Sequence, residues 1–149
     1  MKKTFLILGI SMLALGSVSS CGKKGCTDAN ADNYDASAKK DDESCTYTAS
    51  LVFYYSQTTY LNDMLSPGHT NLEYFVESES VGTFPADNAW VSASAPDCNS
   101  SGVFQVDISL SKQSKKLLSY EVKDADDGTS LYTGSVNVDG GACTAIKLQ

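Results

Sequence analysis

The chain contains little of what enzyme active sites are usually built from. It has a single histidine, His69, in the stretch LSPGHTN, where a turn histidine is more often ordinary surface than a general base. With one histidine, a zinc site would depend on carboxylates. The sequence has no G-x-S-x-G elbow, no G-x-G-x-x-G loop and no phosphate-binding loop. A serine–histidine–aspartate triad needs no fixed spacing, so an enzyme stays the third choice of function, and we predict no catalytic residue.

Basic side chains are also scarce. Lysine and arginine number 11 against 18 carboxylates, and the net charge of −7 becomes −9 once Lys2 and Lys3 are removed with a signal peptide. Because nucleic-acid affinity comes largely from basic contacts to phosphate, nucleic acid is excluded as a partner. An acidic domain of this kind favours solubility and attracts cations.

The N-terminus carries one long apolar run, residues 5–15, behind two lysines. This run is too short to span a bilayer and predicts a secretory signal peptide over residues 1–20. It ends in SVSSC, which resembles the small-residue box of bacterial lipoproteins, cut just before a cysteine that is then acylated, for example with palmitate. The resemblance implies lipidation of Cys21, attachment to the lipid bilayer, and a short tether over residues 21–25.

The cysteine count agrees with this interpretation. An exported chain usually pairs its thiols, yet this one has five cysteines. Acylation of Cys21 leaves four, for which three connectivities exist. By position along the chain they fall into two pairs, Cys26 with Cys45 and Cys98 with Cys143. In lipoproteins of the enteric type, an aspartate after the acylated cysteine favours retention in the inner membrane, and here Gly22 follows Cys21. The resemblance to lipoproteins therefore implies the outer membrane and leaves the periplasmic and cell-surface faces open.

No stretch shows a convincing helical stripe, whereas alternating apolar residues recur after residue 47. In VFQVDISL (103–110), for example, Phe104, Val106 and Ile108 share one face, as in a half-buried strand. The predicted strands are residues 49–56, 72–78, 89–95, 103–110, 117–123, 130–138 and 143–148, with one helical turn in 58–65. Short strands with turn signals between them predict an all-β, antiparallel β-sandwich over residues 47–149.

The last part of the chain resembles a small β-sandwich module of exported Bacteroidetes-type proteins. The resemblance rests on four short patterns in residues 97–149: C-x-S-S-G beginning at Cys98, a strand with a tyrosine at Tyr120, G-x-V-x-V beginning at Gly134, and G-G-x-C-T-x-I-x-L beginning at Gly140. It implies a prealbumin-like or immunoglobulin-like sandwich with a Cys98–Cys143 bridge, and no catalytic activity.

Residues 26–45 are an acidic segment bracketed by cysteines, which we call the knot. The knot resembles a short repeat of exported and surface proteins from similar bacteria, with the usual form C-T-D-P-x-A-x-N-Y-N-P-x-A-x-x-D-D-G-S-C. Alanines stand here in place of both prolines, and Glu43 in place of the glycine, which argues against a positive-φ turn at that position. We expect Tyr34 to pack over the knot disulfide.

The knot also holds a set of candidate calcium ligands. Asp28, Asn30 and Asp32 stand at alternate positions, as at the start of many calcium loops. Hard oxygen ligands suit calcium, and the candidate set is Asp28, Asn30, Asp32, Asp41 and Asp42. The alternative is a solvated spacer between lipid and sandwich, whose Asp and Asn side chains cap turns.

Aromatic side chains on a sandwich sometimes stack on sugars. The candidate glycan-binding residues are Tyr54, Tyr60 and Trp90, with Tyr55 and Tyr74 as further aromatics, although strand aromatics are mostly core. The sequence thus predicts a non-catalytic structural or interaction lipoprotein, whose partner is an unidentified envelope protein or glycan. The alternative is a calcium-stabilised glycan- or protein-binding module.

Overall fold

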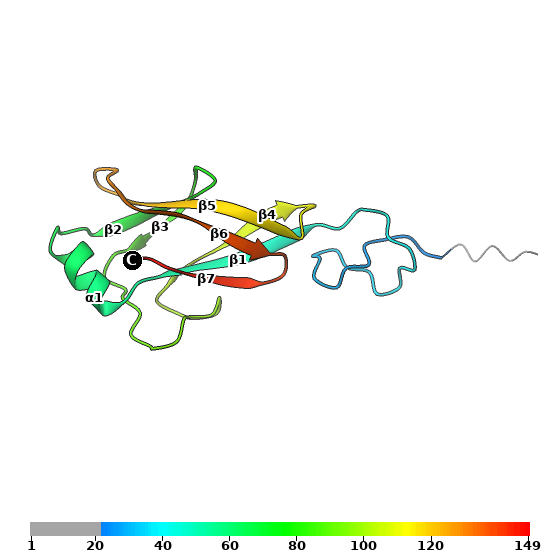
Figure 1. The fold of residues 1–149 in the computed structure, drawn as a ribbon, viewed down its shortest axis with the longest axis horizontal. Helices are drawn as coiled ribbons and strands as arrows, with labels where there is room; N and C mark the ends of the chain where they lie inside the picture. Colours follow the sequence, from blue (N-terminus) through cyan, green and yellow to red (C-terminus); the bar gives the residue numbers. More distant parts are fainter. Residues whose placement is uncertain (1–21) are drawn as a thin grey trace, which may run out of the picture.

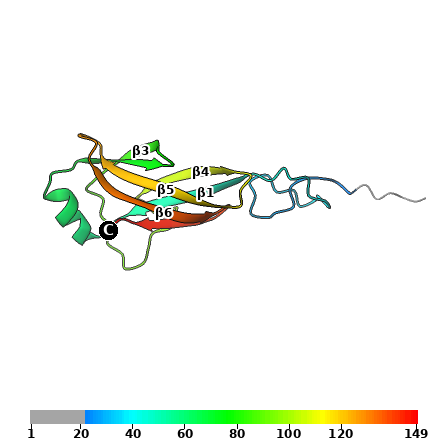
Figure 2. The same cartoon turned by 45° about the horizontal axis from the view of Figure 1, so that its top comes forward.

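The computed structural model describes residues 22–149 (Figure 1). The predicted signal peptide, residues 1–20, and the predicted lipidation site, Cys21, lie outside the described residues. The molecule is elongated, with the knot at one end (Figures 1 and 2). A short helical segment, α1 (Gln57–Thr59) followed by η1 (Tyr60–Leu65), lies at the other end. In the described part of the chain, no helix is long and apolar enough to cross a membrane.

Two sheets form a β-sandwich, as predicted. The strands are β1 (Tyr47–Tyr54), β2 (Asn71–Val76), β3 (Glu79–Pro85), β4 (Phe104–Ser111), β5 (Lys115–Asp124), β6 (Ser130–Asp139) and β7 (Cys143–Lys147). One sheet has the order β4-β1-β7 and the other β3-β2-β5-β6. Neighbouring strands are antiparallel except β1 and β7, which run parallel. The predicted antiparallel β-sandwich is confirmed, and the parallel pairing of β1 with β7 is an addition that the sequence did not indicate.

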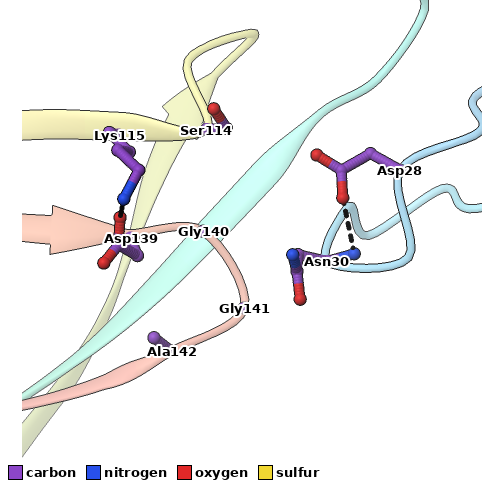
Figure 3. Close-up of a pocket in the computed structure, with 8 residues that line it drawn as sticks. All are labelled: Asp28, Asn30, Ser114, Lys115, Asp139, Gly140, Gly141 and Ala142. Atoms are coloured by element: carbon purple, nitrogen blue, oxygen red, sulfur yellow. Dashed lines mark hydrogen bonds and ion pairs between the residues drawn. The ribbon is translucent and has the colours of Figure 1, made fainter.

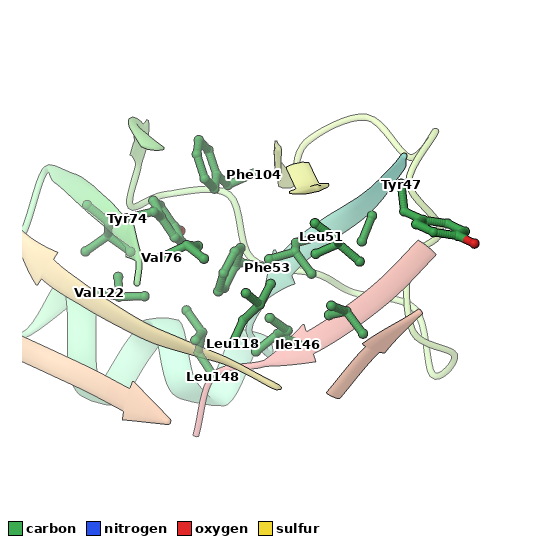
Figure 4. Packing of buried hydrophobic residues seen from close by; sticks show 14 of the residues in the cluster. Tyr47, Leu51, Phe53, Tyr74, Val76, Phe104, Leu118, Val122, Ile146 and Leu148 are labelled. Carbon is green, nitrogen blue, oxygen red and sulfur yellow. The ribbon is translucent and has the colours of Figure 1, made fainter. Parts of the chain in front are cut away.

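The core lies between the two sheets and is rich in aromatic rings (Figure 4). Tyr74 of β2 stacks on Phe104 of β4 with ring centroids 4.1 Å apart, and Phe53 of β1 lies 5.2 Å from Tyr74. The alternation predicted for β4 is confirmed, because Phe104 and Leu110 are buried while Gln105 is exposed. Burial of each large side chain contributes roughly 1.5–3 kcal/mol, so these rings hold the sheets together.

One predicted strand is wrong and one real strand was not expected. Residues 89–95 are not a strand, and β3 (Glu79–Pro85) takes their place in the sandwich. β3 contains Gly82 and Pro85, residues that weaken a strand pattern. The tight turn before it places Glu77 and Ser78 at positive φ (52° and 68°). Asn-Gly or Asp-Gly is the usual sequence for such a turn, and neither is present.

The segment that was expected to be a strand covers the outer face of the β4-β1-β7 sheet. Trp90 packs there against a small cluster of Val52, Cys98 and Val103. Val52 points away from the central core, yet it is fully buried. A loop thus covers this strand face through Trp90, while residues 91–95 are exposed.

Candidate functional site

The knot is docked on the sandwich and does not hang from it as a loose spacer. The disulfides Cys26–Cys45 and Cys98–Cys143 both form, as predicted. Cys26, Ala31 and Cys45 are buried, and they belong to the same apolar cluster as the core. The knot therefore extends the core beyond the end of β1.

Hydrogen bonds that two knot carboxylates accept from β1 fix this junction. Tyr47 of β1 donates its hydroxyl proton to Oδ2 of Asp28 at 2.8 Å. Thr48 donates from its hydroxyl to Oδ2 of Asp32 at 2.9 Å and from its backbone N–H to Oδ1 at 3.2 Å. The backbone N–H of Asp32 donates in turn to the carbonyl of Thr46 at 2.8 Å. These bonds attach the knot to the first two residues of β1.

Two glycines, Gly140 and Gly141, allow the turn from β6 to β7 to pack closely against Tyr47 and the knot. A Cβ atom on Gly141 would lie 2.9 Å from the backbone oxygen of Asn30, and Gly141 has φ of +72°. A Cβ atom on Gly140 would lie 2.5 Å from the ring of Tyr47. Only glycine fits both positions without displacing the backbone or the ring.

A polar cavity of about 430 Å³ opens where these parts meet (Figure 3). It is lined by Asp28, Asn30, Ser114, Lys115, Asp139, Gly140, Gly141 and Ala142. Lys115 and Asp139 form an ion pair of 2.7 Å on its sandwich side. The cavity combines carboxylates, an amide, a hydroxyl and an ammonium group, a set that suits a small hydrophilic ligand.

Hydrogen bonds, with one ion pair, lower the pKa of three knot carboxylates, Asp28, Asp35 and Asp42. The pKa of Asp28 lies below its ordinary value of 3.8, mainly because the backbone N–H of Asn30 donates to it, and next because Tyr47 does. The same Asp28 raises the pKa of Tyr47. The Lys23 ammonium group lowers the pKa of Asp35, which it contacts at 2.6 Å. Hydrogen bonds from Ser44 lower the pKa of Asp42.

The structure brings together only part of the predicted calcium set. Asp28 and Asn30 line the cavity, whereas the Asp32 carboxylate is bonded to Thr48. Asp41 accepts from the backbone N–H of Glu43, and Asp42 from that of Ser44, as turn-capping side chains do. Within residues 22–149, no group of three or more His, Cys, Asp or Glu side chains is placed to hold a metal ion. Calcium binding stays a prediction.

One expectation about the knot is wrong, and a second, that Tyr34 packs over the knot disulfide, stays a prediction. Glu43 has φ of 61°, so the positive-φ turn forms although glutamate stands where the repeat has glycine. Tyr34 is 46% exposed, and the buried aromatic of the junction is Tyr47, which is 6% exposed. Tyr47 lies two residues after the end of the knot, but nothing in the local sequence indicates that its hydroxyl would meet Asp28.

The candidate glycan-binding aromatics do not form one surface. Tyr54 and Trp90 pack on the outer cluster around Val52, whereas Tyr60 packs against the main core. Trp90 also donates its indole N–H to the carbonyl of Ser94 at 2.7 Å. Tyr55 and Tyr74 are buried, with exposed fractions of 2% and 1%, so neither ring face is open to a sugar.

His69 is not an ordinary surface residue, contrary to the expectation from its turn. Its side chain is 13% exposed, and Nδ1 contacts a carboxylate oxygen of Asp124, which is 6% exposed. Asp124 also accepts from the backbone N–H of Asp126 at 2.6 Å, and this bond is the main reason why its pKa is lowered. The pair ties the loop after η1 to the end of β5. His69 lines neither the junction cavity nor the groove described below.

Comparison with known protein families, with curated proteins and with solved structures finds no match to this chain.

Proposed function

We propose that this chain is a lipid-anchored envelope protein, attached to the outer membrane by acylated Cys21, and that it displays a non-catalytic interaction module. The main support for this proposal is that the knot is docked on the sandwich. Because the knot is bonded to β1 on one side and to the residues after Cys21 on the other, an anchor at Cys21 would present the sandwich in a defined way.

The contacts between tether and knot support this geometry. Lys39 donates its backbone N–H to the carbonyl of Lys23 at 2.8 Å, and Gly25 donates to the carbonyl of Lys40 at 3.2 Å. The predicted tether is thus paired with the knot at Lys23 and Gly25. The helical end of the molecule, α1 and η1, lies opposite the knot (Figure 1), and would face away from the lipid.

The number of cysteines gives separate support for acylation of Cys21. The sequence has five cysteines, and four of them form the two disulfides. Cys21 is the remaining one, at the position where the lipoprotein box places acylation.

Metabolic labelling with a palmitate analogue tests the proposal. The wild-type chain should take up label and fractionate with outer membranes, and Cys21→Ser should do neither. Val18→Ala, which keeps a small apolar residue in the box, is the matched control and should label normally. A wild-type chain that is released without label would refute anchoring. Protease treatment of intact cells then shows which membrane face carries the domain.

The junction cavity favours a second candidate, a module that binds a ligand with the help of calcium. Asp28, Asn30 and Asp139 supply oxygen atoms to one cavity. A ligand or ion that binds only the folded state raises the melting temperature by mass action. Melts of the chain in calcium and in EDTA, repeated with Asp28→Ala, should differ by several degrees only in the wild type. Identical melts would remove this candidate.

A further inference from the structure

β3 and β4 are the edge strands on one side of the sandwich, and this side is a second candidate binding surface. Both strands are outermost in their sheets. Phe104 of β4 lies 6.2 Å, between ring centroids, from Phe84 of β3, so the two edges are on the same side. Figure 2 shows β3 and β4 along one border of the molecule.

A groove of about 380 Å³ lies between these edges. We call it the edge groove. Apolar side chains of Val76, Val81 and Ile108 line it, together with the charged groups of Glu77, Glu79, Asp107 and Lys116. Val81 and Ile108 pack against the core but stay partly exposed. The groove is therefore a site where the core is left uncovered.

The free edge of β4 can be assigned from its register. The backbone N–H of Ser50 in β1 donates to Ala142, next to β7, at 3.0 Å, and Ser50 pairs with Asp107. Opposite residues of an antiparallel pair either bond each other or both point away. The backbone N–H and C=O of Asp107 therefore point out of the sheet, and those of Gln105 and Ser109 do the same.

This edge lacks the features that usually prevent strand addition. Lysine, proline and covering segments are the common protections of an edge strand, and the β4 sequence FQVDISLS contains neither lysine nor proline. No strand of residues 22–149 pairs with the outer side of β4. An extended peptide can thus add to β4 through backbone bonds and place alternate side chains in the groove.

The charge of the edge groove indicates which kind of peptide segment it binds. Three carboxylates and one ammonium group line the groove, and Lys116 lies 3.3 Å from Glu77, so Glu79 and Asp107 are left without a cationic partner among the lining residues. A second copy of this acidic chain would be repelled. We propose that the edge groove binds an extended segment of another envelope protein that alternates apolar residues with lysine or arginine. This inference rests on the proposed role as an interaction module.

Binding of a synthetic peptide tests the proposal that a strand adds to β4 in the edge groove. The probe is a peptide of about eight residues, long enough to span β4, which alternates valine with lysine. It should bind the full chain and slow hydrogen exchange at the amides of Gln105, Asp107 and Ser109. A peptide with glutamate in place of lysine should not bind. Equal binding of a peptide with glycine in place of valine would overturn strand addition, because attraction of charge alone would explain it.

Two variants locate the site. The double variant Glu79→Gln with Asp107→Asn should weaken binding about fivefold, since two exposed charge contacts are lost; asparagine still accepts the bond from Ser50. Glu43→Gln with Asp87→Asn removes the same charge elsewhere and should leave binding unchanged. Gln105→Pro removes one outward N–H and should abolish the slowed exchange.

Several results would refute the inference. It fails if the two charge variants bind alike, if Gln105→Pro keeps the protection, or if the chain dimerises through β4 and the peptide does not compete. These results would leave palmitate labelling at Cys21 untouched, so failure of the groove is distinguishable from failure of the anchor.

Discussion

The hydroxyl of Tyr47 donates to the carboxylate of Asp28 at 2.8 Å, across 19 residues of the chain. This bond joins the first residue of the sandwich to the third residue of the knot. With the bonds between Asp32 and Thr48, it makes knot and sandwich one folded unit.

Removing this hydroxyl should loosen the junction. In Tyr47→Phe, the ring still packs against Gly140, but Asp28 loses a donor. We expect amides of the knot to exchange about fivefold faster, as for the loss of one net hydrogen bond. Tyr34→Phe, at a tyrosine that is 46% exposed, is the control. Equal exchange in both variants would contradict the prediction.

The knot should lose stability in acid. The pKa of Asp28 is lowered in the folded state, so its contribution is fully present above its ordinary pKa of 3.8 and is lost as the pH falls through the folded value. Asp35 and Asp42 act in the same direction. Urea titrations at a series of pH values should show a constant free energy of unfolding down to about pH 5 and a decline below it. Asp28→Asn should flatten that decline, and Asp87→Asn should not.

The two disulfides should differ in what they contribute. Their sequence separations are 19 and 45 residues. On the chain-entropy account, replacing Cys26 and Cys45 by serine should lower the free energy of unfolding by about 3 kcal/mol, and replacing Cys98 and Cys143 by about 4 kcal/mol. Urea denaturation of the two double variants checks this order. A larger loss for the knot pair would mean that the bridge also holds the packing of Ala31 and Tyr47.

The turn between β2 and β3 offers a stabilising change. Ser78 has φ of 68°, a conformation that costs a residue with a side chain about 1 kcal/mol relative to glycine. Ser78→Gly should therefore raise the free energy of unfolding by about that amount. Ser135→Gly, at an exposed position within β6, should lower it because glycine weakens a strand. Thermal melts that shift in the same direction for both would argue against the turn geometry.

Trp90 should matter for stability because of what it covers. It packs over Val52 and the Cys98–Cys143 bridge, so Trp90→Ala should cost about 2 kcal/mol in urea denaturation. Val91→Ala is the matched control, since Val91 is 84% exposed and its loss should change little. Near-equal stability of the two variants would mean that the loop does not act as a cover.

The sequence was sufficient to predict the strands in which apolar and polar residues alternate regularly. β4 was predictable because Phe104, Val106 and Ile108 alternate with polar residues over a long stretch. β3 was not, because Gly82 and Pro85 interrupt its pattern and its turn uses Glu77 and Ser78. The segment around Trp90 was expected to be a strand, but only Trp90 packs on the sheet and residues 91–95 are exposed.

The sequence indicated some residues of the candidate site but not how the fold arranges them. The spacing of Asp28 and Asn30 indicated oxygen ligands within the knot, whereas no motif indicated a site at residues 139–141, in the turn from β6 to β7. That these two regions meet depends on the docking of Asn30 against Gly141, which are far apart in the sequence. No local pattern encodes a contact of that kind, because its partners are chosen by the whole fold.

The parallel pairing of β1 with β7 has a consequence for how the chain is made. β1 ends at residue 54 and β7 begins at residue 143, so the ribosome delivers the central strand of the three-stranded sheet long before one of its two neighbours. Until the last strand emerges, β1 keeps one side with unsatisfied backbone groups, and such a side invites pairing with other chains. Truncated products of this protein should therefore aggregate, even when they contain the whole of the four-stranded sheet.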